Sequence, residues 1–301
     1  MKATLVIPTY NRARRLEALL ECVARQEGGA LERVVVCDDG SPDDTREVAE
    51  AFRDRLPLVY AWQEDRGFRA GQARNMGIEH AVGEVVIFVD DDVLVRPDFV
   101  QAHVEAHARL ETERSVVLGF RHRAPHFEAV VPTWEQIVAG ERDDRVGDLR
   151  GAEVHEHPKP WIFVYSCNFS VRLGGPELRF DEGFHGWGME DTELGYRLHE
   201  AGYAIVAEPQ ARVLHIEDPA PRDPFRCEER ALPPTYCSYV RNAVYFMDKY
   251  PDDRDLADWV RGDIRWYVLD DRGRWVKNGH ENDVDFVIET CRAQRRDDAA
   301  Q

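Results

Sequence analysis

VVIFVDDD (residues 85–92) joins five apolar residues directly to three aspartates. A short, continuous apolar run of this kind is typical of a β-strand that is covered on both faces of a sheet. The segments ATLVIP (3–8), RVVVC (33–37) and LVYAWQ (58–63) have the same character, and apolar residues at helical spacing lie between them. Alternating strands and helices predict an α/β fold with a Rossmann-like, mostly parallel, doubly wound sheet and flanking helices.

The second half of the chain has a less regular pattern. SVVLGFRHR (115–123) and WIFVYSCNFSVR (161–172) are predicted as strands, and GYAIVAEPQARVLHIED (202–218) as two short strands around Pro209. The charged residues 132–150 show only weak periodicity, which predicts a mobile loop or short helices.

Residues 219–301 are predicted to form a C-terminal helical extension. TYCSYVRNAVYFM (235–247) places its apolar residues on one face of a helix. DVDFVIETC (283–291) is predicted as the last helix, before a polar tail.

The composition limits the classes of function. The chain has 301 residues, 43% of them hydrophobic, and a formal net charge of −18. This length allows one large domain or two small ones. The acidic excess argues against nucleic acid as a partner, because phosphate binding needs a basic surface. A phosphorylated small molecule is still allowed, since a few arginines or a metal ion can offset the charge locally.

The sequence contains no recognisable membrane segment. No apolar run approaches the ~20 residues that span a bilayer, and the apolar stretch near the N-terminus is too short for a signal peptide. The six cysteines form no Cys-x-x-Cys pair, which favours reduced, buried thiols over disulfides. We therefore expect a cytoplasmic protein, either free or peripheral to the inner face of the membrane.

Polar clusters follow three of the predicted strands. They are Thr9-Tyr10-Asn11, Asp38-Asp39 and Asp90-Asp91-Asp92. In doubly wound sheets, ligands bind beyond the carboxyl ends of the strands. Three polar strand ends in one half of the chain therefore predict a binding site there.

The aspartates at residues 90–92 repel one another unless a cation lies among them. Mg²⁺ and Mn²⁺ take oxygen ligands and bridge diphosphates, so one interpretation is a metal site. The alternative is an acidic turn. His215 ends an apolar run, where a lone histidine is usually structural; imidazole also suits Mn²⁺ if the chain returns beside Asp92.

Two further groups of charges each allow two interpretations. Asp38 and Asp39 fit an Asx-type turn, but a carboxylate there can also accept the N3–H of a uracil ring. Arg66, Arg69 and Arg74 fit solvated surface charge, but they can also bind a diphosphate. The sequence has no P-loop and no Gly-x-Gly-x-x-Gly after a strand, which argues against a P-loop NTPase and a dinucleotide oxidoreductase. It also has no Gly-x-Ser-x-Gly elbow.

FHGWGMEDTELGYRL (184–198) places a tryptophan between two glycines and two acids before an amphipathic helix. Asp191 lies at or next to the predicted N-cap, and Glu190 suits the positive end of the helix dipole. Capping does not explain Trp187 and its glycines. A flat ring on a closely approachable backbone can stack on the apolar face of a sugar ring, and a carboxylate beside it can act as a general base.

Four motifs, in this order, resemble those of the family 2 glycosyltransferases of GT-A fold. They are VIPTYNR (6–12), VVVCDDGSPDDT (34–45), DRGFRAGQARNMGIEHAVGEVVIFVDDD (65–92) and GWGMEDTELGYRL (186–198). The likeness is greatest to bacterial chondroitin polymerase domains, and the Trp-Gly-x-Glu-Asp segment also resembles the β-1,4-galactosyltransferases. The resemblance covers residues 1–219.

The resemblance implies an inverting, metal-dependent transfer of a sugar from a UDP-sugar to a hydroxyl of a glycan or glycoconjugate. It implies a nucleotide-sugar-binding half (1–110) and an acceptor-binding and catalytic half (111–218) of one GT-A domain. By motif position, Asp191 is the implied general base, and Asp92 and His215 are the implied ligands of Mn²⁺ or Mg²⁺. The implied acceptor-binding residues are Trp187, Gly188 and Glu190. The implied donor-binding residues are Pro8, Thr9, Tyr10, Asp39, Gly67, Phe68, Arg74, Asn75, Asp90 and Asp91.

Two positions depart from the family pattern. Asp91 makes the Asp-x-Asp an unbroken row of acids, so the ligand assignment can shift by one residue, and Met189 replaces a common glycine. Two other functions share parts of the pattern. A sugar nucleotidyltransferase is disfavoured because PTYNRARR (8–15) stands in place of its usual glycine-rich loop. A non-catalytic nucleotide-sugar-binding module is disfavoured because every acidic position is kept. The donor sugar, the acceptor and the oligomeric state stay open.

Overall fold

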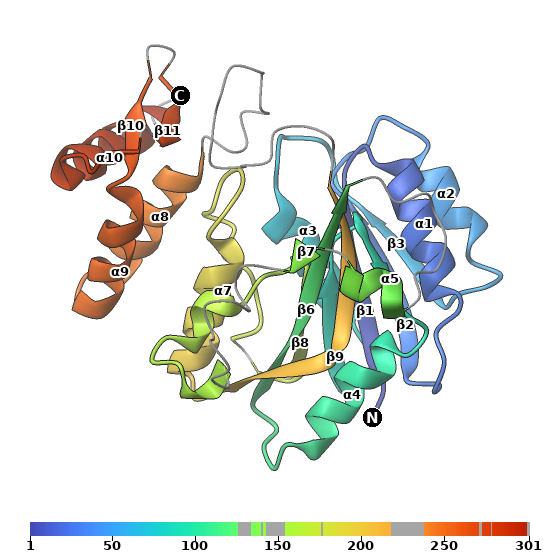
Figure 1. Cartoon of the computed structure of the whole chain (residues 1–301). Helices are drawn as coiled ribbons and strands as arrows, with labels where there is room; N and C mark the ends of the chain where they lie inside the picture. Colours follow the sequence, from blue (N-terminus) through green and yellow to red (C-terminus); the bar gives the residue numbers. More distant parts are fainter. Residues whose placement is uncertain are drawn as a thin grey trace. The chain divides into compact units, whose positions relative to one another are not determined.

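The computed structural model of the chain divides into two compact units (Figure 1). The described residues are 1–125, 134–139, 141–142, 154–175, 177–217, 238–270, 273–277 and 279–299. Unit 1 comprises Met1–Arg66, Ala70–Phe180 and Asp191–Pro219. Unit 2 comprises Gly67–Arg69, Asp181–Glu190 and Ala220–Gln301. The functional division at residues 110 and 218 stays a prediction.

Unit 1 is built on one nine-stranded sheet with the order β3-β2-β1-β4-β8-β6-β9-β5, and β7 pairs with β6. The strands are β1 (Ala3–Thr9), β2 (Leu31–Asp38), β3 (Leu58–Trp62), β4 (Val85–Val89), β5 (Val93–Val95), β6 (Ser115–Pro125), β7 (Glu141–Arg142), β8 (Asn168–Arg172) and β9 (Ala204–Glu217). The first four strands pair in parallel, as do β6 and β9. The predicted α/β fold is confirmed, and β8 joins its two parallel parts by antiparallel pairing.

Helices cover both faces of the parallel part of the sheet. The helices of unit 1 are α1 (Ala13–Val23), α2 (Thr45–Ala51), α3 (Ala70–Glu79), α4 (Phe99–Arg109), α5 (Trp134–Ala139) and α7 (Glu190–Glu200). On one face, Leu5 and Ile7 of β1 share a buried cluster with Leu16 and Leu20 of α1. On the other face, α3 contacts β1 and β2. Because both faces are covered, the strands are apolar at every position rather than at alternate ones.

Two strand predictions in the second half are corrected. In residues 161–172 only β8 is a strand, and a 3₁₀ helix, η2 (Pro160–Phe163), precedes it. Proline at the first helical position favours this turn, and the Trp161 ring packs edge-on against Tyr196 of α7. The apolar character of this stretch therefore comes from tertiary packing.

The two short strands expected around Pro209 form one strand, β9. Its pairing with β6 is interrupted, since Leu118 pairs with Ala207 but Phe120 pairs with Arg212. Proline has no N–H to donate to a ladder, so it is accommodated where the regular pairing lapses. Within residues 132–150, the structure describes only the short helix α5 and the strand β7. The prediction of a mobile loop or short helices for the other residues lies outside the described part.

Unit 2 contains most of the C-terminal part of the chain. Its elements are α8 (Tyr239–Lys249), α9 (Arg254–Ile264), the hairpin β10 (Tyr267–Leu269) and β11 (Trp275–Lys277), and α10 (Val284–Ala299). The predicted helices correspond to α8 and α10, whereas α9 and the hairpin were not expected. The α9 helix begins at a local cap, in which the Asp253 side chain accepts the Leu256 N–H at 2.8 Å.

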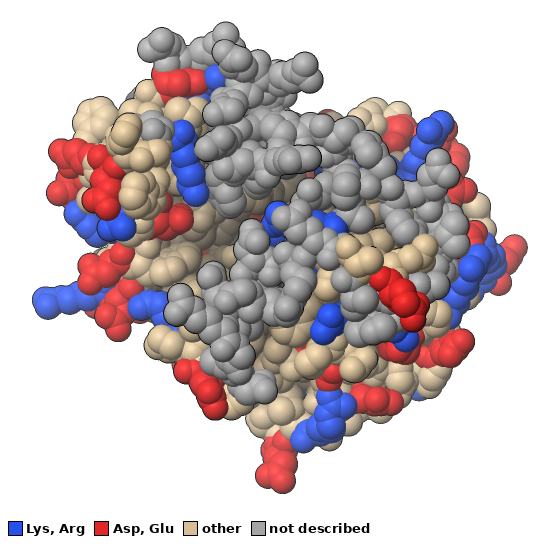
Figure 2. Space-filling model, viewed as in Figure 1, with Lys and Arg blue, Asp and Glu red and all other residues tan. Residues whose placement is uncertain are grey.

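Charges and thiols follow simple patterns over the described residues. Figure 2 shows acidic and basic side chains interspersed on the face in view. Cys22, Cys37, Cys167 and Cys291 are buried free thiols, while the other two cysteines lie outside the described residues. No helix in the described part of the chain combines the length and apolarity needed to cross a membrane.

A buried polar layer joins α4 to the sheet. His103 contacts Ser170 Oγ at 2.8 Å and Asn168 Oδ1 at 3.0 Å, and His107 contacts Ser115 Oγ at 2.8 Å and Ser170 Oγ at 2.9 Å. Burial lowers the pKa of His103 to about 4 and the pKa of His107 to about 3. Both rings are therefore neutral in the folded protein, and each is satisfied by hydroxyl or amide partners.

These histidines predict a loss of stability in mild acid. In the unfolded chain they take up protons below about pH 6.5, but in the folded protein only near pH 4 and pH 3. The free energy of unfolding should therefore fall by about 2 kcal/mol per histidine between pH 7 and pH 5. Urea unfolding at both pH values measures this loss.

His107→Gln should reduce that loss by about half, because glutamine keeps a neutral polar side chain that does not titrate. The exposed His80, changed to Gln, is the matched control and should leave the pH dependence as in the wild type. A His107→Gln variant with the full wild-type loss would contradict the assignment.

Candidate active site

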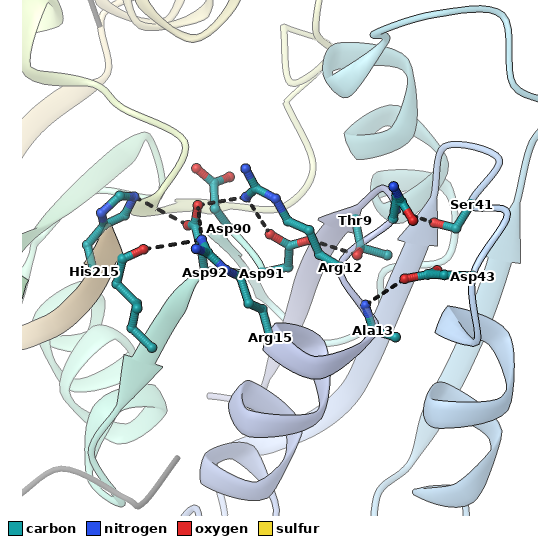
Figure 3. A network of polar contacts seen from close by, with 12 residues as sticks. Thr9, Arg12, Ala13, Arg15, Ser41, Asp43, Asp90, Asp91, Asp92 and His215 are labelled. Carbon is teal, nitrogen blue, oxygen red and sulfur yellow. Dashed lines mark hydrogen bonds and ion pairs between the residues drawn. The ribbon is translucent and has the colours of Figure 1, made fainter. Parts of the chain in front are cut away.

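The polar ends of β1 and β4 meet in unit 1, as the parallel pairing of these strands requires. Thr9 Oγ1 donates to Asp91 Oδ2 at 2.7 Å (Figure 3). Thr9, Asp91 and Asp92 are all buried, with at most 9% of each residue exposed. Two adjacent carboxylates in such a place need cationic partners, because burial disfavours their charged forms.

Arg12 and Arg15, at the start of α1, supply this charge. Arg12 Nη1 lies 3.0 Å from Asp91 Oδ1 and 2.7 Å from Asp92 Oδ2, and Arg15 Nη1 lies 3.6 Å from Asp92 Oδ2. Figure 3 shows the side chains of Arg12, just before α1, and Arg15, in its first turn, extending to the carboxylates. Sequence reasoning missed these two residues. The available signal was their three-residue spacing, which puts two cations on one helix turn directly after a polar strand end.

The two carboxylates are in different electrostatic states. Burial and the charge of Asp92 raise the pKa of Asp91, although Arg12 opposes them. Burial also acts to raise the pKa of Asp92, but the charges of His215, Arg12 and Arg15 outweigh it and lower that pKa. Asp92 is thus the carboxylate held in the ionised form that metal coordination requires.

His215 lies beside Asp92, because β9 returns next to β5 and pairs His215 with Val93. His215 Nε2 is 3.4 Å from Asp92 Oδ1. That carboxylate oxygen is buried and accepts no hydrogen bond from any residue that the structure describes. His215 was predicted to suit a metal only if the chain returns beside Asp92. The structure shows this return.

The side chains of Asp92 and His215 fit a divalent cation. Asp92 offers a buried oxygen that lacks a hydrogen bond, and His215 offers an imidazole nitrogen within reach of the same point. A carboxylate with an imidazole suits Mn²⁺, and Mg²⁺ prefers oxygen ligands. The described residues include no cluster of three or more ligand side chains.

Asp90 and Arg74 form a second ion pair near these acids. Arg74 Nη2 lies 2.9 Å from Asp90 Oδ1, and the Arg74 side chain is only 5% exposed. Its guanidinium also lies 5.5 Å from the centroid of the Phe180 ring. The neighbouring Asn75 is hydrogen-bonded to the backbone of Phe180 in both directions, at 2.8 and 2.9 Å. Asn75 therefore anchors the chain at Phe180.

Asp38 and Asp39 have separate roles at the end of β2. Asp38 Oδ1 accepts the N–H groups of Gly40 and Ser41 at 3.1 and 2.8 Å, which makes it the Asx-type turn. Asp39 is buried beside the end of β1, and its Oδ1 accepts a hydrogen bond from Gln63 Nε2 at 2.6 Å. Sequence reasoning did not identify Gln63.

The remaining predicted donor residues lie at the ends of these strands or in unit 2. Pro8 pairs with Cys37 within the sheet. Tyr10 is 44% exposed and donates to Asp65 Oδ2 at 2.9 Å. Gly67 and Phe68 belong to unit 2, where the Phe68 side chain is exposed.

Asp191 is the second residue of α7 rather than its N-cap. Its Oδ2 accepts the N–H of Ser166 at 3.0 Å and the Ser166 hydroxyl at 3.3 Å, and its Oδ1 accepts the Thr192 N–H at 2.8 Å. These contacts fix the carboxylate from two sides while the residue stays partly exposed. Sequence reasoning did not identify Ser166, because it lies 25 residues away in an irregular segment.

Trp187, Gly188 and Glu190 lie in unit 2. Trp187 is partly exposed, whereas Gly188 and Glu190 are buried. The backbone is left-handed at Gly188 (φ +101°) and again at Met189 (φ +75°). Met189 is 3% exposed, so its side chain is buried despite a conformation that favours glycine.

A family model described as "Glycosyl transferase family 2" matches residues 4–157. The chain belongs to this family. A second model, described as "N-terminal domain of galactosyltransferase", matches residues 172–219. The two models together cover the acids that follow β4, the Trp-Gly-x-Glu-Asp segment and His215, so the predicted family is confirmed.

Curated relatives of this chain include a glucosyltransferase and a chondroitin synthase. The chain is 36% identical to a validoxylamine A glucosyltransferase of Streptomyces hygroscopicus subsp. jinggangensis over 272 residues, which are 82% of this chain and 61% of the relative. It is 28% identical to a chondroitin synthase of Escherichia coli over 242 residues, covering 72% of this chain and 35% of that one. The chain thus spans about 60% or less of the length of these relatives.

Solved structures share the fold of this chain. Staphylococcus aureus TarS 1–349 in complex with UDP-GlcNAc has a TM-score of 0.59 at 18% identity, covering 84% of this chain and 68% of that one. The mannosyltransferase PcManGT from Pyrobaculum calidifontis, in complex with GDP-Man and Mn²⁺, has a TM-score of 0.59 at 17% identity, covering 99% and 75%. The fold is therefore that of GT-A glycosyltransferases.

The left-handed backbone at Met189 predicts an unusual order of stability between two variants. Met189→Gly and Met189→Ala both remove the buried side chain, but only glycine adopts a positive φ without strain. We expect Met189→Gly to be the more stable of the two by about 1 kcal/mol, although both should be less stable than the wild type. Urea unfolding of the three proteins measures the order.

A matched control is the same pair at Met247, which is buried in α8 with regular helical geometry. There alanine should be more stable than glycine, as is usual in helices. If alanine also proved the more stable at residue 189, the backbone of this segment would not be left-handed in solution.

Proposed function

We propose that this glycosyltransferase moves a sugar from a UDP-sugar to a hydroxyl acceptor with inversion at the anomeric carbon. The observation that carries the proposal is the pair of Asp92 Oδ1 and His215 Nε2 at 3.4 Å, beside the polar ends of β1 and β4. Ligands of such sheets bind at this edge. A carboxylate and an imidazole directed at one point suit a divalent ion that neutralises a diphosphate.

Asp92 and His215 would hold Mn²⁺ or Mg²⁺, and the bound ion would stabilise the negative charge that grows on the departing diphosphate. Arg74 lies close by and can add hydrogen bonds to the phosphate oxygens. Both oxygens of Asp91 are engaged by Thr9 and Arg12. This favours Asp92 over Asp91 as the metal ligand.

The uracil ring of the donor nucleotide is assigned to a position at the end of β2. Asp39 is buried, and its contact with Gln63 holds the carboxylate in place. A carboxylate there can accept the N3–H of uracil. The TarS structure contains UDP-GlcNAc, and a relative at 36% identity is named a glucosyltransferase. UDP-glucose and UDP-GlcNAc are therefore the first donors to test.

Asp191 is assigned as the general base. It would take the proton of the acceptor hydroxyl while that oxygen bonds to the anomeric carbon and the bond to the diphosphate oxygen breaks. UDP then leaves with the electron pair of the broken bond. The contacts with Ser166 and Thr192 support this role, because they fix the carboxylate without enclosing it.

The direct test is a panel of UDP-sugars with Mn²⁺, read by UDP release, with validoxylamine A and simple glycosides as acceptors. Release from one UDP-sugar, stimulated by an acceptor, supports the proposal. Release of pyrophosphate from a sugar phosphate and UTP would instead identify a nucleotidyltransferase. UDP-sugar binding without any turnover would identify a binding module.

We predict that Asp91→Asn and Asp92→Asn differ in their effect on metal binding. Calorimetric titration of Mn²⁺ in the presence of UDP should show at least about tenfold weaker binding for Asp92→Asn and His215→Ala, because each removes a ligand. Asp91→Asn should change this affinity less. His80→Ala is the exposed control. Equal losses for Asp91→Asn and Asp92→Asn would mean that the ligand assignment is wrong.

We predict that Asp191→Asn keeps UDP binding near the wild-type affinity and lowers sugar transfer by ~10²–10⁴-fold, since a general base contributes about that much. Asparagine keeps the size of the side chain but cannot accept the proton. Asp98→Asn, at the start of α4, makes the same substitution at another helix start and should leave transfer unchanged. Turnover of Asp191→Asn within a few-fold of the wild type would remove Asp191 from this role.

A further inference from the structure

The Trp187 segment is held by a helix from the C-terminal part of the chain. Within unit 2, Ser238 Oγ donates to the Trp187 carbonyl at 2.9 Å. Asn242 Nδ2 donates to the Gly188 carbonyl at 2.9 Å and lies 3.5 Å from the Trp187 carbonyl. Ser238 and Asn242 are almost fully buried. Two side chains at the start of α8 thus fix two successive carbonyls of one loop.

The Trp187 ring rests on aromatic residues of the same C-terminal part. Its centroid is 5.7 Å from that of Tyr239, at an interplanar angle of 33°. Tyr239 in turn lies 6.0 Å from Tyr267 of β10, at 32°. The Tyr239 hydroxyl donates to Asp263 Oδ2 of α9 at 2.8 Å. Helix α8, helix α9 and the hairpin therefore all contribute to the support of this one indole.

Gly188 has a steric reason to be glycine in this arrangement. A Cβ at residue 188 would lie 2.7 Å from Cδ2 of Tyr239, closer than real Cβ contacts, and the φ of +101° is strained for other residues. The loop and the Tyr239 ring are therefore fitted to each other. The absence of a side chain at Gly188 allows the Tyr239 ring of α8 to pack against the indole of Trp187.

The contacts between α8 and this loop do more than bury apolar surface. Here the contacts are directional, with hydrogen bonds to two carbonyls and a tilted ring against the indole. They restrict the position of the backbone and the plane of the ring together. Trp187 nevertheless remains partly exposed, so part of its surface can meet a ligand.

We propose that Tyr239 and Asn242 are positioning residues that hold Trp187 as a platform for the acceptor, and that α8 thereby takes part in acceptor recognition. This rests on the proposed function and on the acceptor-binding role that the family resemblance implies for Trp187. The acceptor would carry a sugar or cyclitol ring with an apolar C–H face, since a flat, electron-rich ring binds such a face. Helix α8 is then part of the acceptor site.

The test uses the full chain labelled with 5-fluorotryptophan, in which Trp187→Phe identifies the ¹⁹F signal of Trp187. Methyl β-D-glucopyranoside is the probe, and it is titrated into the wild type and each variant. In the wild type the Trp187 signal should shift as the sugar is added. In Tyr239→Leu the signal should already be displaced without sugar, and the apparent affinity for the probe should fall by up to about tenfold.

Tyr239→Phe keeps the ring against the indole and should restore most of the response. Asn242→Ala should behave like Tyr239→Leu, because it frees the Gly188 carbonyl. Arg292→Gln, which removes an ion pair between α10 and Asp248 of the same helix α8, is the control and should respond like the wild type. UDP affinity, measured by calorimetry, should be unchanged in all of them, which a general loss of folding would not allow.

Two results would overturn the proposal. One is a wild-type Trp187 ¹⁹F signal that does not shift when the sugar is added. The other is a Tyr239→Leu variant whose signal and affinity for the sugar match those of the wild type. Failure of the proposed function looks different, since then the wild type releases no UDP from any UDP-sugar. An active wild type with a wild-type-like Tyr239→Leu would reject only the role of α8.

Discussion

Asp91 and Asp92 are adjacent carboxylates buried at the carboxyl end of β4, and the cations that balance them organise this end of the sheet. Removing two such charges from water is costly unless partners compensate. Arg12 meets both carboxylates, which ties the start of α1 to the end of β4. His215 approaches from β9, so the return of the chain across the sheet is directed to the same point.

This balance also differentiates the two acids. Asp91 is held by Thr9 and Arg12 through both of its oxygens, and burial raises its pKa. Asp92 keeps one oxygen that accepts no hydrogen bond from the described residues, in an environment whose cations lower its pKa. A row of acids that looks uniform in the sequence is therefore divided into a structural member and a member suited to coordination. The two acids at the end of β2 also differ, since Asp38 closes a turn and Asp39 accepts a hydrogen bond from Gln63.

The sequence predicted the parallel strands and their polar ends, because burial on both faces leaves a continuous apolar run that needs no tertiary information to be seen. It also indicated that His215 suits a metal ion only if the chain returns beside Asp92. It could not predict the arginines of α1 as partners, because their pairing depends on how the helix is placed over the sheet. The strand expected at Trp161 was wrong for a related reason, since the Trp161 ring packs edge-on against Tyr196 of α7.

The Trp-Gly-Met segment shows how a local irregularity can have a remote cause. Two successive left-handed residues, Gly188 and Met189, are unfavourable for an isolated loop. They persist because Asn242 binds the carbonyl of Gly188, the ring of Tyr239 occupies the space beside it, and the Met189 side chain is buried. The conformation of the loop is thus determined by contacts with residues that follow it by more than fifty positions. A pattern confined to the loop identified Trp187 as exceptional, but only the C-terminal helices explain why its backbone has this form.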